Sequence, residues 1–155
     1  MPALRVPAHR ILVQYAAGRA HAPVAARIHK WAREALSCTG RAQGCEVTVR
    51  IVDEAEGIHL NRTYRGRDRA TNVLSFAYTD IPPQQGALGD IALCAPVVAA
   101  EAKVLGCSLD AHWAHLVVHG IMHLCGHNHE RPEEAVVMEA LEVRALANLG
   151  YGDPY

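Results

Sequence analysis

The segment from His112 to Glu130, HWAHLVVHGIMHLCGHNHE, determines most of what we expect of this chain. Six of the ten histidines of the protein lie in it, among mostly apolar residues. Ser108 or Asp110 is suited to cap a helix that runs to about Cys125. Gly126 then predicts a turn, because glycine readily adopts the left-handed conformation that ends a helix. The segment therefore predicts an apolar helix that carries histidines and ends sharply.

Three of these histidines have the spacing of a metal site. His119 and His123 are four residues apart, so on a helix they project from one face, about 6 Å apart along the axis. The turn at Gly126 lets His129 supply a third imidazole nitrogen. Three protein nitrogens leave one tetrahedral position for water, which is typical of a catalytic zinc. We therefore predict one zinc ion on His119, His123 and His129.

The other histidines leave alternatives open. His127 competes with His129 for the third position, since both follow the turn. His112 and His115 lie on the same helix face, but the triplet His115, His119 and His123 would spread along about 12 Å of helix axis. Its outer members could not share one ion, so we assign His112 and His115 to packing or to hydrogen bonds behind the ligands. A single histidine on an apolar helix is most often only a packed ring.

The HxxxHxxGxxH spacing is also that of the metzincin proteases, which have a glutamate directly after the first histidine as general base. In this chain that position is Gly120, which cannot transfer a proton. A metal-dependent peptidase therefore lacks its base.

The remaining chain predicts an α+β domain. Strands are expected at Arg10–Tyr15, Cys45–Val52, Asn72–Tyr78 and Leu88–Cys94, the last two as an antiparallel pair on either side of a loop at Pro82, Pro83 and Gly86. Helices are expected from Pro23 to Gly40, from Glu54 to about Tyr64, from Pro96 to Leu105 and from about Glu133 to Leu149. The first and last of these helices have apolar stripes, at Val24, Ile28, Trp31 and Ala35, and at Val137, Leu141, Ala145 and Leu149. A small mixed sheet of four strands with about five helices follows.

Composition limits the classes of protein to which this chain can belong. Half of the 155 residues are apolar, so residues 1–155 are expected to form one domain with a sizeable core. The five cysteines are odd in number and form no CxxC pair, so we expect buried thiols rather than disulfides. There is no secretory signal and no stretch long enough to span a bilayer, so we expect a cytoplasmic protein that does not bind a membrane. The net charge of −1 argues neither for nor against nucleic-acid binding.

A basic segment precedes the third predicted strand. Arg62, Arg65, Arg67 and Arg69 lie close together, beside the aromatic Tyr64. Most charge runs are solvated surfaces, but the arginine guanidinium is suited to bidentate phosphate contact. An arginine beside a metal ion is a plausible arrangement for phosphodiester cleavage.

Three blocks of the sequence resemble the bacterial YbeY family. They are LNRTYRGRDRATNVLSFAY (Leu60–Tyr78), LGDIALC (Leu88–Cys94) and the histidine segment. The resemblance implies a single-strand-preferring, zinc-dependent endoribonuclease of small-subunit ribosomal RNA maturation and ribosome quality control. It also implies an α+β fold with a cleft floored by the histidine helix and lined by residues 72–76. Partners would be ribosomal RNA, small-subunit proteins and assembly factors. The family's catalytic and metal residues fall on Arg65, His119, His123 and His129.

One departure and several alternatives remain. Family members commonly carry Tyr-Asp before the third metal histidine, where this chain has His127-Asn128. Asn128 can form a hydrogen bond but cannot relay a proton, so the departure concerns rate more than metal binding. No general base is evident, and either water or a 2′-hydroxyl can be the nucleophile. The rival functions are a non-catalytic, zinc-stabilised ribosome assembly factor and a metal-dependent peptidase.

Overall fold

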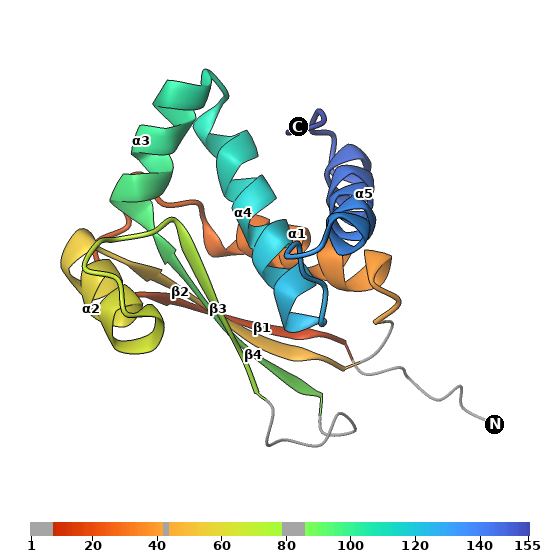
Figure 1. Cartoon of the computed structure of the whole chain (residues 1–155), viewed down its shortest axis with the longest axis horizontal. Helices are drawn as coiled ribbons and strands as arrows, with labels where there is room; N and C mark the ends of the chain where they lie inside the picture. Colours follow the sequence, from red (N-terminus) through yellow and green to blue (C-terminus); the bar gives the residue numbers. More distant parts are fainter. Residues whose placement is uncertain (1–7, 42–43, 79–85) are drawn as a thin grey trace.

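A computed structural model describes residues 8–41, 44–78 and 86–155 of the chain. These residues form four strands and five helices (Figure 1). The strands are β1 (Arg10–Tyr15), β2 (Glu46–Val52), β3 (Val73–Ala77) and β4 (Ala87–Cys94). The helices are α1 (Ala25–Cys38), α2 (Glu54–Arg65), α3 (Ala95–Leu105), α4 (Leu109–Leu124) and α5 (Pro132–Asn148). The predicted α+β class and elements are confirmed, whereas the loop at Pro82 and Pro83 lies outside the described residues.

The four strands form one mixed sheet in the order β1-β2-β4-β3. β1, β2 and β4 are parallel, and β3 pairs antiparallel with β4, as the sequence predicts. Alternation along β2 puts Val47, Val49 and Ile51 on the covered face, where all three are fully buried. Because β3 is the last strand in this order, it is an edge strand, and it contacts the histidine helix α4.

The helices form a layer over one face of this sheet. α4 lies in the middle of the layer, with α1 and α5 beside it, α3 leading into it and β3 and β4 beneath it (Figure 1). α2 lies apart from this layer, at one end of the sheet. Its Gly57 packs against Cys94, the last residue of β4.

The burial of α4 leaves one row of side chains partly exposed along most of its length. Large apolar residues face the sheet and the neighbouring helices, and Trp113, Val117 and Ile121 are each at most 1% exposed. From His112 to Leu124 only His115, His119 and His123 are not buried. Because these residues recur every four positions, they form one row on the open side of the helix. Packing around α4 thus directs its histidines toward a common opening.

The predicted start of α1 and the first residue of its predicted apolar stripe are wrong. Pro23 is not the first residue of α1: the helix begins at Ala25, and Val24 is its N-cap and is 62% exposed. The Pro23 carbonyl instead accepts a hydrogen bond of 2.6 Å from the Tyr15 hydroxyl, which holds the turn before the helix. The other members of the predicted stripe, Ile28, Trp31 and Ala35, are buried.

The predicted apolar stripe of α5 is wrong at Val137, whereas Ala145 is buried and Leu141 and Leu149 pack partly buried against the core. Val137 is 52% exposed, and the buried positions are Met138, Glu142, Ala145 and Leu146. Three consecutive apolar residues, Val136 to Met138, made the helical phase ambiguous. Packing against α1 and α4 selects the face that includes a glutamate, which hydrophobicity alone does not favour.

The structure also bears on the expected burial of the cysteines and on the expected lack of a membrane-spanning helix. Cys94 is a buried thiol, but Cys107 is exposed, so burial of the cysteines is not general. Among the described residues, none of the helices has both the length and the apolar character that crossing a bilayer requires.

Gly120 allows α4 to lie close to the sheet. A Cβ atom at this position would come within 3.0 Å of two side-chain atoms of Ile91, which is fully buried in β4. The same close approach leaves no room for the glutamate that a metzincin carries there.

We expect Gly120→Val to lower the free energy of unfolding by about 1–3 kcal/mol, because Ile91 cannot move away from the added methyl groups. Urea denaturation followed by circular dichroism measures this change. Gly18→Val is the matched control, since a Cβ at Gly18 meets nothing within 4 Å. Equal stability of the two variants would contradict close packing at Gly120.

Candidate metal centre

The end of α4 brings the third histidine back toward the helix. The Gly126 amide donates to the His123 carbonyl at 3.0 Å, and the His127 amide donates to the Met122 carbonyl at 3.0 Å. This pair of hydrogen bonds is a Schellman motif, with Gly126 at φ 91° in the left-handed position. The chain therefore reverses within a few residues, as predicted from Gly126, and His129 returns to the open row of α4.

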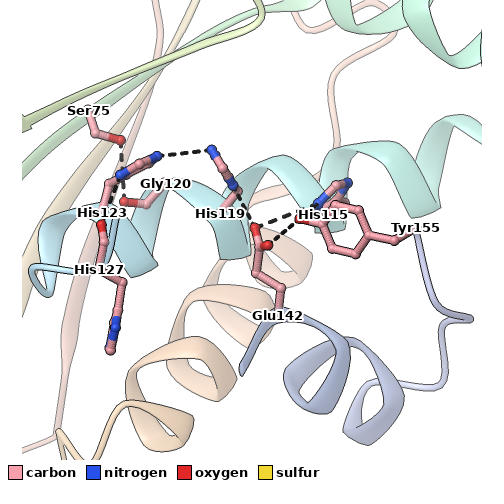
Figure 2. A network of polar contacts seen from close by, with 8 residues as sticks. All are labelled: Ser75, His115, His119, Gly120, His123, His127, Glu142 and Tyr155. Atoms are coloured by element: carbon pink, nitrogen blue, oxygen red, sulfur yellow. Dashed lines mark hydrogen bonds and ion pairs between the residues drawn. The ribbon is translucent and has the colours of Figure 1, made fainter. Parts of the chain in front are cut away.

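The rings of His119, His123 and His129 converge on one point. Each offers a ring nitrogen, and these three atoms lie within 4.8 Å of one another. The Nε2 atoms of His119 and His123 are only 3.1 Å apart (Figure 2). The His129 ring centroid lies 5.5 Å from that of His119 and 5.1 Å from that of His123. The structure thus brings together all three histidines that the sequence singled out.

The opposite nitrogens of the first two rings have fixed partners. His123 Nδ1 lies 3.0 Å from the backbone carbonyl of His127, which can only accept, so Nδ1 carries the proton. His119 Nδ1 lies 2.6 Å from Oε1 of Glu142 and donates to it. In the neutral imidazole, both Nε2 atoms are then unprotonated acceptors.

Two acceptor nitrogens that face each other at 3.1 Å repel one another unless a cation lies between them. Two nitrogens bound at about 2.0–2.1 Å to a tetrahedral zinc are roughly 3.3–3.4 Å apart, close to the observed separation. Three imidazoles with no cysteine or carboxylate suit borderline metals such as zinc rather than magnesium or calcium. The donor set therefore fits a single zinc-like ion.

Burial, together with charge repulsion from the neighbouring rings of His119 and His129, lowers the pKa of His123 to about 4. The ring is therefore neutral near physiological pH, which is the form that binds a metal.

Glu142 is the important residue that the sequence prediction missed. It is fully buried on α5, and its carboxylate accepts from His119 and from the hydroxyl of Tyr155 (Figure 2). Burial raises its pKa, but hydrogen bonds from His115, His119 and Tyr155 outweigh this and bring the pKa to about 2. A glutamate among the apolar residues of α5 was the available signal. The ionised carboxylate fixes the His119 ring and makes its Nε2 a stronger donor to metal.

His115, His119 and Glu142 also come close enough to suggest a second metal group. Hydrogen bonds account for this cluster without an ion, since Glu142 binds the Nδ1 proton of His119 and the Tyr155 hydroxyl. His115 Nε2 lies 3.4 Å from the same hydroxyl. We therefore interpret the cluster as a set of hydrogen bonds behind the candidate ligand His119.

The two remaining histidines of the segment have other partners. The His127 ring points away from His119 and His123, so only its backbone carbonyl contributes to the site (Figure 2). This arrangement does not support the alternative in which His127 is the third ligand. His112 is buried and bonds Glu101 at 2.9 Å, and Glu101 also accepts from the Asn72 side chain at 3.0 Å.

A cleft of about 400 Å³ opens beside the three histidines. Residues 72–75 of the third strand region line it, as predicted, but Phe76 does not; its ring instead packs on Tyr64 with centroids 5.0 Å apart. Arg65, the last residue of α2 rather than part of the following loop, lines the cleft from the other side. Its guanidinium donates to the Ser75 carbonyl at 3.1 Å.

The other arginines of the basic segment divide into two groups. Arg62 pairs with Asp68 at 2.5 Å, so its charge is already balanced. Arg67 and Arg69 line, with Arg65, an adjoining cavity of about 270 Å³. The buried Asn61 amide holds this loop by donating to the Arg69 carbonyl at 2.6 Å. The cleft thus has a positive border next to the histidines.

Comparisons with known proteins agree on one family. A family model described as Endoribonuclease YbeY matches residues 15–150. The chain is 53% identical over 148 residues to Endoribonuclease YbeY of Aromatoleum aromaticum, covering 94% of this chain and 91% of the relative. It is 50% identical over 145 residues to Endoribonuclease YbeY of Nitrosomonas europaea, covering 94% and 84%.

A solved structure shares the fold. The solution structure of a Thermotoga maritima protein aligns with a TM-score of 0.60 over 92% of each chain, at 22% sequence identity. At this identity the likeness concerns the arrangement of the elements alone.

We expect Glu142→Gln to weaken Zn²⁺ binding by about tenfold or more, because the neutral amide no longer polarises His119. Competition with a chromophoric chelator measures the affinity. Glu133→Gln, which removes an exposed charge from the first turn of α5, is the control. Equal affinity of the two variants would contradict the role of Glu142.

The free energy of unfolding of the metal-free protein should depend on pH through the protonation of His123. Its pKa is about 4 in the folded protein and 6.5 ordinarily, so the unfolded chain binds more protons between these values. The free energy of unfolding should therefore fall as the pH is lowered from 6.5 to 4. Urea titrations across this window test it. His123→Asn should flatten the dependence and His59→Asn, an exposed position on α2, should not.

Proposed function

The chain belongs to the YbeY endoribonuclease family, and from this premise we propose that it is a zinc-dependent enzyme that cleaves single-stranded regions of ribosomal RNA. One zinc ion would be held by His119, His123 and His129. Residues 1–155 would act as one endoribonuclease domain in the cytoplasm, in small-subunit ribosomal RNA maturation and ribosome quality control. Small-subunit proteins and assembly factors are the partners that this role requires.

The observation that carries the zinc proposal is the pair of facing nitrogens. His119 and His123 each commit Nδ1 to a fixed acceptor, so both Nε2 atoms need a cation where they meet, and His129 adds a third donor there. Zinc bound there would supply Lewis acidity, which activates water and polarises a phosphoryl oxygen. Glu142 would keep the His119 ring in position during turnover. Its pKa of about 2 makes its carboxylate a weak proton acceptor, so it is not suited to serve as a general base.

Arg65 is proposed to bind the phosphate that is cleaved or its neighbour. Its side chain lines the cleft of the three histidines as well as the cavity that Arg67 and Arg69 share. The hydrogen bond to the Ser75 carbonyl engages one nitrogen and leaves other guanidinium donors for phosphate oxygens. A positive charge in the same cleft as the three histidines would neutralise charge that develops on the phosphoryl group.

Gly120 argues against the peptidase alternative, because it occupies the position of the metzincin base and packs onto Ile91. The replacement of Tyr-Asp by His127-Asn128 is compatible with metal binding, since His123 bonds the backbone carbonyl of residue 127. That hydrogen bond does not depend on the side chain there.

We expect His119→Ala, and zinc removal from the unaltered protein, each to abolish cleavage of single-stranded ribosomal RNA fragments. Adding zinc back should restore only the unaltered protein. Gel analysis of end-labelled RNA measures cleavage, and detection of 2′,3′-cyclic phosphate ends would identify the 2′-hydroxyl as nucleophile. Equal cleavage by His119→Ala would indicate a contaminating nuclease and contradict the proposal.

We expect Arg65→Ala to lower kcat by about a hundredfold, because a donor to the transition-state charge is lost. Zinc content and thermal stability should not change. Arg62→Ala on the same helix is the control, since Arg62 is paired with Asp68. A non-catalytic assembly factor predicts instead that no variant, and not even the unaltered protein, shows a measurable rate.

A further inference from the structure

A second pocket, larger than the metal cleft, lies between α3, α4 and the end of the chain. We call it the α3 pocket. Its volume is about 780 Å³, within the range of small-molecule sites. Its lining includes apolar side chains from α3 and α4 and the ring of the last residue, among them Val97, Val104, Leu105, Leu116 and Tyr155.

The α3 pocket adjoins the metal cleft. Asn72, Val73 and His119 line both of them, so these shared side chains alone define the border that a ligand at the histidines would pass to reach the α3 pocket. Val73 also lines the arginine cavity. The three hollows therefore meet around one residue of β3, with the metal cleft as their common neighbour.

The two neighbours of the metal cleft differ in charge. Arg65, Arg67 and Arg69 line one of them, which suits phosphate. Among the described residues that line the α3 pocket, the charged ones are Glu54 and Glu101, and none is a lysine or arginine. A phosphate would be repelled there, whereas an uncharged, flat and largely apolar group would be accepted.

The α3 pocket also has features that recognise a nucleobase. Val104 is 88% exposed and Leu105 is 66% exposed, so apolar surface is available for a ring to cover. The rings of His115 and Tyr155 lie edge to face at 5.5 Å and offer an aromatic surface for stacking. The Asn72 amide donates to both oxygens of Glu101, at 3.0 Å to Oε1 and 3.3 Å to Oε2, and His112 bonds Oε1 at 2.9 Å. Oε2 therefore holds one long hydrogen bond and has a further lone pair to accept from an amino group.

We propose that the α3 pocket binds the nucleobase next to the cleaved phosphate, and that Glu101 makes it favour bases with an exocyclic amino group over uracil. This inference rests on the proposed endoribonuclease function, because it is the phosphate at the metal cleft that places the base. Proteins that recognise single-stranded RNA commonly hold splayed bases in this way, by stacking and by hydrogen bonds to their edges.

A binding experiment tests the pocket without relying on catalysis. Methyl resonances of Val97 and Val104 in the zinc-loaded protein are followed by NMR during titration with adenosine 5′-monophosphate, uridine 5′-monophosphate or ribose 5-phosphate. We expect the adenine nucleotide to shift both residues, with an affinity about tenfold above that of the uridine nucleotide. Ribose 5-phosphate should leave them unchanged. Equal shifts with ribose 5-phosphate would overturn the proposal.

Matched variants test whether the nucleotide-induced methyl shifts arise in the α3 pocket. Ala100→Trp fills the pocket from an exposed position on α3 and should abolish the methyl shifts. Ala140→Trp, at an exposed position on α5, should preserve them. Glu101→Gln should remove the preference for adenine over uracil. Circular dichroism and zinc content verify that each variant is folded, and unchanged nucleotide binding by a folded Ala100→Trp protein would refute the site.

Cleavage of oligonucleotides separates this inference from the proposed function. In an RNA with one cleavage site, an abasic residue beside that site should raise KM about tenfold for the unaltered protein and for Ala140→Trp, but not for Ala100→Trp. Cleavage with no dependence on that base would overturn the inference and leave the endoribonuclease intact. Base-dependent nucleotide binding without any RNA cleavage would support the pocket and overturn the endoribonuclease.

Discussion

The burial of α4 is the constraint on which the rest of this structure depends. The helix is enclosed by the sheet below it and by α1, α3 and α5 around it, and Gly120 brings it within close contact of Ile91. The large apolar side chains of α4 are buried in that packing. What remains open is the row of His115, His119 and His123, so the energy that stabilises the fold also fixes the direction in which the histidines point.

The supporting contacts turn this row into a site for a cation. A backbone carbonyl and a buried carboxylate hold the outer nitrogens of His123 and His119, and the inner nitrogens are left facing each other. Burying the ionised Glu142 costs free energy, which the hydrogen bonds from His119 and Tyr155 offset. Tyr155 therefore supports the candidate metal centre indirectly, through its hydrogen bond to Glu142.

Charge around the centre is arranged asymmetrically. Arginines from the end of α2 and the loop after it lie on one side, and the apolar pocket with its glutamates lies on the other. A single-stranded nucleic acid has the matching asymmetry, with phosphates along its backbone and bases to one side. Val73 of the edge strand β3 lines the hollows on both sides as well as the metal cleft.

Local patterns in the sequence were sufficient for the element order, the antiparallel β3–β4 pair and the grouping of His119, His123 and His129. All of these follow from short-range periodicity, from capping residues and from the turn at Gly126, which act within a few residues of each other. Glu142, Tyr155 and the face of α5 depended on which helices pack together, since residues far apart in the chain meet only after folding. The sequence by itself therefore determined which three histidines converge, and the tertiary structure alone decided what holds their rings and what surrounds them.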